Sequence, residues 1–166
     1  MMTNDILETA RHPSEKKFAK ICIRKNYKII HSTEDQDMYE HWDWKTTNPN
    51  TNKVSLIDVK GARKRRRKDE NVDFSITWLE IKNVNGEKGS LLGLADYIAF
   101  EQARYFLIVR REDLRGWLKK KIINKKIVDQ PEEALYRYYK RSDRKDIITL
   151  VNIKDIIKDL KVWKFF

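Results

Sequence analysis

Cysteine is nearly absent from this chain of 166 residues, which contains only Cys22. It therefore cannot form an internal disulfide, and this excludes the disulfide-stabilised class of small secreted proteins. The expected compartment is intracellular and reducing: the cytoplasm, or the host's cytoplasm if the protein is viral. The three histidines, His12, His31 and His41, do not stand at zinc-site spacing with this cysteine, so no zinc site is predicted.

Long apolar runs are also missing. No run reaches roughly 20 apolar residues, the length that a membrane-spanning helix needs, so no membrane partner is expected. Residues 1–10 are polar and mixed in charge, which is not typical of a signal peptide. The sequence contains no Walker loop, no Rossmann fingerprint and no nucleophile elbow, so nothing in it points to the enzyme classes that those motifs mark.

Charge of one sign, in contrast, is in excess. The chain has 36 Lys and Arg against 25 Asp and Glu, a formal net charge of +11. Its length fits one globular domain over residues 1–166, and 40% hydrophobic residues are enough for a core. The positive excess favours a polyanionic partner such as DNA, through phosphate contacts and counterion release.

The order of elements predicts an α/β protein in which helices flank a central mixed β-sheet. Helices are expected at residues 14–25, with Ser14 as a cap, from 113 onward, at 131–139 and at 153–160. Strands are expected at 27–31, 38–45, 53–61, 73–82, 95–100, 105–110 and 147–151, with a loop at 84–93.

A predicted hairpin carries the candidate chemistry. Residues 46–52 are dense in turn formers, and a turn centred between Asn50 and Thr51 places Asp43 opposite Asp58. Strand alternation puts Lys60 on the same face as Asp58. The other face is apolar and is expected to enter the core; it consists of Trp42, Trp44, Ile57 and Val59.

Two carboxylates beside an ammonium are the residue types that hydrolysis of a phosphodiester requires. Mg²⁺ is bound by one or two carboxylates together with phosphate and water, and Mn²⁺ is expected to substitute for it. The metal offsets charge on the phosphate, and a nearby lysine orients the attacking water. Asp-x-Lys by itself is frequent on exposed strands, so it is Asp43 across the hairpin that makes Asp58 and Lys60 a candidate site.

Glu15 is a further candidate, because it lies on the apolar stripe that Phe18 and Cys22 define in the first predicted helix. A carboxylate on that stripe points inward or along its border. The alternative is an ordinary first-turn glutamate that the helix dipole favours.

The order of Glu15 on a leading helix, Asp43, and then Asp58-Val59-Lys60 resembles the PD-(D/E)XK, or restriction-endonuclease-like, nuclease superfamily, most closely its Holliday-junction-resolvase and phage-endonuclease branches. The resemblance covers about residues 12–110 and leaves 111–166 as a C-terminal extension. It implies Asp43 and Asp58 as Mg²⁺ ligands, Lys60 as the residue that serves the attacking water, and Glu15 as an outer or second-metal ligand. Trp42 stands where the family's nominal proline would be.

Glu80-Ile81-Lys82 also fits Glu-x-Lys, with Asp58 then as the lone aspartate. Asp58 and Lys60 are preferred for two reasons. The hairpin holds Asp43 and Asp58 more tightly together than the longer connection to Glu80 would, and this assignment gives Glu15 a role in the site. On a neighbouring strand, Glu80 and Lys82 would still line the same cleft; the alternative for them is an exposed strand end.

The DNA-facing part is expected at a basic loop, in which six cations follow the active strand: Arg63, Lys64, Arg65, Arg66, Arg67 and Lys68. Residues 136–141 interleave tyrosines with cations, and they either stack on bases or, as preferred, pack in a helical core.

The sequence thus predicts a Mg²⁺-dependent DNA endonuclease acting on branched or recombination DNA, with a homodimer as a further expectation. Three rival interpretations stay open. They are a non-catalytic nucleic-acid-binding module, an RNA-directed nuclease on the same fold, and a structural protein with a basic surface.

Overall fold

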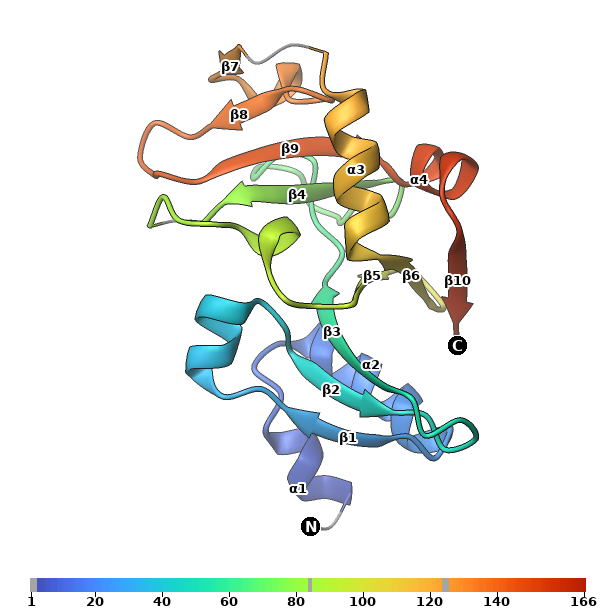
Figure 1. Cartoon of the computed structure of the whole chain (residues 1–166). Helices are drawn as coiled ribbons and strands as arrows, with labels where there is room; N and C mark the ends of the chain where they lie inside the picture. Colours follow the sequence, from blue (N-terminus) through green and yellow to red (C-terminus); the bar gives the residue numbers. More distant parts are fainter. Residues whose placement is uncertain (1–2, 84, 124–125) are drawn as a thin grey trace.

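The computed structural model describes residues 3–83, 85–123 and 126–166 of the chain (Figure 1). Met1, Met2 and Val84, which belong to the segments 1–10 and 84–93 considered above, lie outside the described residues. The helices are α1 (Thr3–Glu8), α2 (Pro13–Arg24), α3 (Arg111–Lys121) and α4 (Ile153–Asp159), with short helical turns η1 (Gln36–Glu40), η2 (Ser90–Leu92) and η3 (Pro131–Glu133). The strands are β1 (Lys28–His31), β2 (Trp44–Thr47), β3 (Val54–Lys60), β4 (Ile76–Lys82), β5 (Tyr97–Glu101), β6 (Phe106–Arg110), β7 (Ile127–Val128), β8 (Tyr138–Lys140), β9 (Ile147–Asn152) and β10 (Val162–Phe165).

In the part of the chain that the structure describes, the strands form two mixed sheets. The first has the order β1-β2-β3-β5-β6-β10, and only its β3–β5 pair is parallel. The second has the order β4-β9-β8-β7, with β7 and β8 parallel. The α/β class with mixed sheets and flanking helices is therefore confirmed. The expectation of one central sheet is wrong, because β4 pairs with β9 and not with the hairpin strands.

The separation of β4 from the first sheet follows from the parallel pairing of β3 with β5. Parallel neighbours need a long crossover connection, and the segment between β3 and β5 supplies it. On its way the chain leaves the first sheet and forms β4, whose Ile76 packs with Ala134 and Leu150 in a small separate core. Figure 1 shows β4, β9 and β8 stacked together, apart from β1, β2 and β3.

Helix α2 covers one face of the first sheet. Its buried Phe18 and Cys22 pack with Trp44, Ile57 and Val59, as the apolar stripe and the strand alternation predict. The expected cap at Ser14 is wrong: the helix begins one residue earlier, at Pro13, since the fixed φ of proline suits the first helical position. Ser14 lies buried inside the first turn.

Helices α3 and α4 build a second core with β5, β6, β9 and β4. Leu114, Trp117 and Leu118 of α3 are buried there, as their spacing predicts, and Ile156 of α4 joins them. The end of the chain is integral to the fold, because β10 pairs with β6 and forms the edge of the first sheet. None of the described helices is long and apolar enough to cross a membrane.

Two expected elements differ from the structure. The helix expected at 131–139 is wrong: only the turn η3 forms, Tyr136 takes a positive φ of 54°, and β8 follows. The first hairpin strand, expected at 38–45, begins only at Trp44, because η1 occupies 36–40 and His41 is left-handed with φ 55°.

Candidate functional site

The hairpin register agrees with the turn chemistry. Trp44 pairs with Ile57 and Thr47 with Val54, as a turn centred between Asn50 and Thr51 requires. Asp43 stands directly before β2. Its amide donates to the carbonyl of Ile57 at 2.8 Å, and its Oδ2 accepts from the amide of Val59 at 2.6 Å. The main chain of β3 thereby holds the Asp43 carboxylate beside Asp58.

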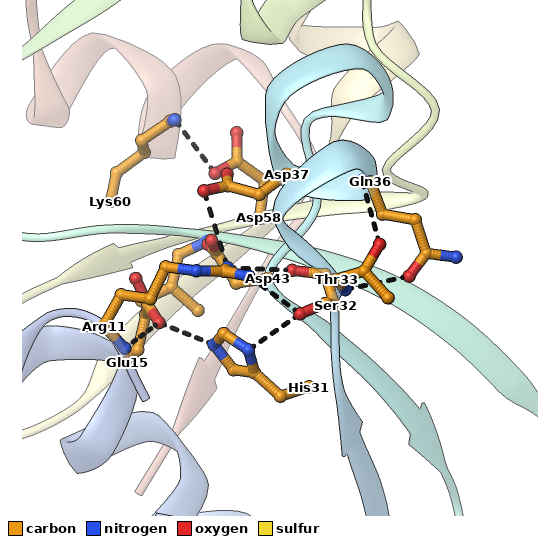
Figure 2. A network of polar contacts seen from close by, with 11 residues as sticks. Arg11, Glu15, His31, Ser32, Thr33, Gln36, Asp37, Asp43, Asp58 and Lys60 are labelled. Atoms are coloured by element: carbon orange, nitrogen blue, oxygen red, sulfur yellow. Dashed lines mark hydrogen bonds and ion pairs between the residues drawn. The ribbon is translucent and has the colours of Figure 1, made fainter. Parts of the chain in front are cut away.

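Asp58 lies in the middle of β3 and faces away from α2, since Ile57 and Val59 on either side of it enter the α2 core. Only 3% of Asp58 is exposed. Its Oδ1 forms an ion pair with Lys60 Nζ at 2.9 Å, whereas its buried Oδ2 has no hydrogen-bond partner among the described residues. Figure 2 shows this pair above Asp43.

Asp43 and Asp58 are two buried carboxylates that lie close together, and their proximity shifts pKa values in the cluster. Burial, followed by the negative charge of Asp58, raises the pKa of Asp43 to about 8. Burial alone would lower the pKa of Lys60, but the charges of Asp58 and Asp43 outweigh it and raise that pKa above its usual value. Lys60 therefore remains an ammonium, and a second cation at Asp43 and Asp58 would relieve the repulsion between them.

Glu15 reaches the same cluster from α2, and its charge also contributes to the raised pKa of Asp43. Its Oε2 accepts from the amide of Arg11 at 2.9 Å and contacts His31 Nε2 at 2.8 Å. Burial opposes ionisation of Glu15, but these contacts prevail and lower its pKa. The structure thus brings Glu15 to Asp43 and gives it a partner of its own.

That partner, His31, is a site residue that sequence reasoning missed. Its Nδ1 lies 3.0 Å from the carbonyl oxygen of Ser32, so both ring nitrogens face oxygen atoms. The guanidinium of Arg11 binds Ser32 as well, at 2.9 and 3.1 Å, and Asp37 at 3.5 Å (Figure 2). Zinc-site spacing gives no role to His31; the signal that could have found it is its place on the strand that follows the helix of Glu15.

Glu80 approaches from the second sheet. Its charge contributes to the raised pKa of Lys60, and its Oε2 lies 3.4 Å from the amide of Ser90. Lys82 is exposed beyond a β-bulge that interrupts β4 after Glu80. Among the described side chains no ion pair or hydrogen bond joins Lys82 to Glu80. The geometry therefore favours Asp58 and Lys60 over Glu80 and Lys82 as the motif pair.

Gly89 packs closely against the backbone of Glu80 in β4. A Cβ on Gly89 would stand 2.6 Å from the carbonyl oxygen of Glu80, whereas one on Gly116 in α3 would meet nothing within 4 Å. We expect Gly89→Ala to destabilise the protein by about 1–3 kcal/mol, because backbone atoms must shift. Gly116→Ala should stabilise it by about 0.5–1 kcal/mol. Urea denaturation measures both, and equal stability of the two variants would contradict this packing.

The basic loop lines a cavity of about 890 Å³ together with Lys60 and Glu80. The loop cations that line it are Arg63, Lys64, Arg65, Arg66 and Arg67; Lys68 does not. Arg65 pairs with Asp73 at 3.2 Å and Arg66 with Glu132 at 3.5 Å. The other three loop cations in the cavity have no ion-pair partner among the described residues, so they remain available to an anionic ligand.

The donor set suits a hard cation bound by two protein ligands. No group of three or more His, Cys, Asp and Glu side chains within the described ranges is arranged to hold a metal ion. Mg²⁺ is commonly held by one or two carboxylates, with water and phosphate completing the shell. The unpartnered Oδ2 of Asp58 and the raised pKa of Asp43, whose negative charge a bound cation would stabilise, fit such a pair of ligands.

Comparison of the chain with protein-family models, with curated proteins and with solved structures finds no match.

Proposed function

We propose that the protein is a Mg²⁺-dependent DNA endonuclease with a restriction-endonuclease-like core. The observation that carries this proposal is the buried meeting of Asp43, Asp58 and Lys60, with an unpartnered carboxylate oxygen on Asp58, next to a cavity lined by cations. A leading helix with Glu15, then Asp43, then Asp58 and Lys60 on the neighbouring strand is the arrangement that the resemblance to the PD-(D/E)XK superfamily implies.

Asp43 and Asp58 are the proposed metal ligands. A bound Mg²⁺ would supply positive charge to offset the charge on the scissile phosphate. Both carboxylates are held by β3, Asp58 as one of its residues and Asp43 through the amide of Val59, so their spacing is set before any ligand binds. Glu15 remains a predicted outer or second-metal ligand, and here His31 and Arg11 hold it in place.

Lys60 is the proposed residue for the attacking water. Its ammonium is held at the Asp58 carboxylate, and Lys60 is one of the residues that line the cavity, so this residue joins the proposed metal ligands to the proposed substrate site. From there it can orient a water molecule or donate to a phosphate oxygen as negative charge develops in the transition state. Attack of water on phosphorus forms one P–O bond, and the ester bond to the leaving oxygen breaks; the water gives up a proton and the leaving oxygen takes one up.

Digestion of a panel of polynucleotides tests the proposal. Branched, duplex and single-stranded DNA and RNA are incubated with Mg²⁺, with Mn²⁺ or with EDTA. We expect cleavage of DNA that requires the metal. Binding without cleavage would instead assign a non-catalytic module, and cleavage confined to RNA would assign an RNA-directed nuclease.

The three loop cations without ion pairs should dominate the salt dependence of DNA binding. Replacing Arg63, Lys64 and Arg67 with alanine should reduce the slope of log affinity against log salt by about two to three, since each lost phosphate contact removes about one. Fluorescence anisotropy across a salt series, in EDTA, measures the slope. A matched control removes three exposed cations of α3 and α4: Lys119, Lys120 and Lys158. Equal slopes for the two variants would refute the assigned role of the loop.

A further inference from the structure

The part of the cavity lining that adjoins the basic loop has a different character, and it contacts the loop where Trp78 Nε1 donates to the carbonyl of Lys64 at 3.2 Å. It is formed by one face of the second sheet, with Trp78 of β4 and Tyr139 of β8 among its residues. The two rings are in contact, with centroids 5.7 Å apart and planes tilted by 42°. Both are half-buried and rest on the core of Ile76, Ala134 and Leu150, so part of each ring remains open. A supported, partly open aromatic surface beside cations is a platform on which bases stack.

A buried carboxylate lines the same part of the cavity. Asp146, which precedes β9, is only 1% exposed and forms an ion pair with Arg141. Its Oδ2 carries that contact, while its Oδ1 has no hydrogen-bond partner among the described residues, and neither has Nε of Arg141. A buried carboxylate oxygen without a donor is costly, and a ligand that supplies a donor there would remove that cost.

The size of the cavity selects the ligand. A volume of about 890 Å³ falls within the range of pockets for small organic molecules. One or two unpaired nucleotides would fit. Lys60 lines this cavity, so a nucleotide bound here would lie next to the proposed hydrolytic centre.

We propose that this cavity is a subsite for an unpaired nucleotide, whose base stacks on Trp78 and Tyr139 while its exocyclic amino group donates to Oδ1 of Asp146. The inference rests on the proposed function for the identity of the polynucleotide as DNA. The substrate class is DNA with a single-stranded segment beside the cleaved bond. Because Asp146 is an acceptor, cytosine with its N4 amino group is favoured over thymine, which presents O4 there.

Binding measured in EDTA tests the subsite without any cleavage. We expect labelled oligo(dC) to bind about tenfold more tightly than oligo(dT) of the same length, as one base-specific hydrogen bond predicts. Asp146→Asn should abolish this preference, because an amide offers thymine O4 a donor. Equal affinity of the wild-type protein for the two oligonucleotides would overturn the assigned contact.

A second variant covers the case in which Asp146→Asn does not fold. Trp78→Ala should weaken the binding of single-stranded DNA about tenfold, the effect of losing one stacked base. It should weaken duplex binding less, because a duplex loses only the support that Trp78 Nε1 gives the loop through the Lys64 carbonyl. Trp163→Ala is the matched control, since Trp163 is 39% exposed on β10 and does not line the cavity. An equal loss in both variants, or in neither, would refute stacking on Trp78.

The two proposals fail separately. A wild-type protein that shows the cytosine preference but never cleaves DNA with Mg²⁺ would retain the subsite and lose the nuclease. A metal-dependent nuclease without the preference would retain the function and lose the subsite. Binding of oligo(rC) with no binding of oligo(dC) would overturn the choice of DNA.

Discussion

Replacement of Asp58 with asparagine is expected to reduce Mg²⁺-dependent DNA cleavage by about a thousandfold or more. The variant keeps the shape of the side chain but removes the charge of a proposed metal ligand, and metal stabilisation of the transition state contributes several kcal/mol. Each 1.36 kcal/mol corresponds to a factor of ten in rate. Initial rates on the DNA substrate that the wild-type protein cleaves best measure the effect.

Lys60→Met should abolish cleavage as well, because the methionine keeps the apolar stem and loses the ammonium. Both variants should retain the far-UV circular dichroism of the wild-type protein and most of its DNA affinity. Glu70→Gln is the control, since Glu70 is an exposed carboxylate near the basic loop. Full activity of either purified site variant would rule out the site. Loss of activity in Glu80→Gln and Lys82→Met, with Lys60→Met active, would assign the alternative pair, in which Asp58 is the lone aspartate.

Without metal, Asp43→Asn is expected to stabilise the protein at pH 8 and above by a few kcal/mol. The folded-state pKa of Asp43 is raised to about 8, mainly by burial and then by Asp58. In the unfolded chain an aspartate has a pKa of about 3.9. The contribution of a raised pKa to stability is full below the unfolded value and is lost as the pH rises through the folded one. The wild-type protein therefore loses this contribution between about pH 4 and pH 8, and the asparagine variant does not.

The measurement is the free energy of unfolding in urea across that pH range, in EDTA and in Mg²⁺. Only the difference between the two proteins is used, because the net positive charge affects both alike. Mg²⁺ should stabilise the wild-type protein at pH 8 more than at pH 5, and it should stabilise Asp43→Asn little. Glu34→Gln, at an exposed position, controls for the loss of one negative charge. Parallel pH profiles for wild type and Asp43→Asn would contradict the buried carboxylate pair.

The most accurate sequence-based predictions concern short-range order. The turn residues around Asn50 and the alternation of β3 were enough to place Asp43 beside Asp58 and to put Lys60 on the face of Asp58. The apolar stripe of α2 was enough to direct Glu15 toward them. The helix expected at residues 131–139 is wrong because its backbone is set by contacts distant in sequence. Tyr136 has a positive φ, and the residues after it pair with β9 as strand β8.

The sequence by itself determined the elements whose periodicity is local: the strands of the hairpin, the helix stripes and the excess of positive charge. A period of 2 or 3.6 residues states which face of an element is apolar, and a turn sets the register of the strands that it joins. Tertiary structure alone decided which edges and faces meet. It paired β4 with β9, brought Glu80 toward Lys60, joined His31 to Glu15, and set Asp146 in the same cavity as the basic loop. These choices depend on burial summed over residues far apart in the chain, and no local pattern records that sum.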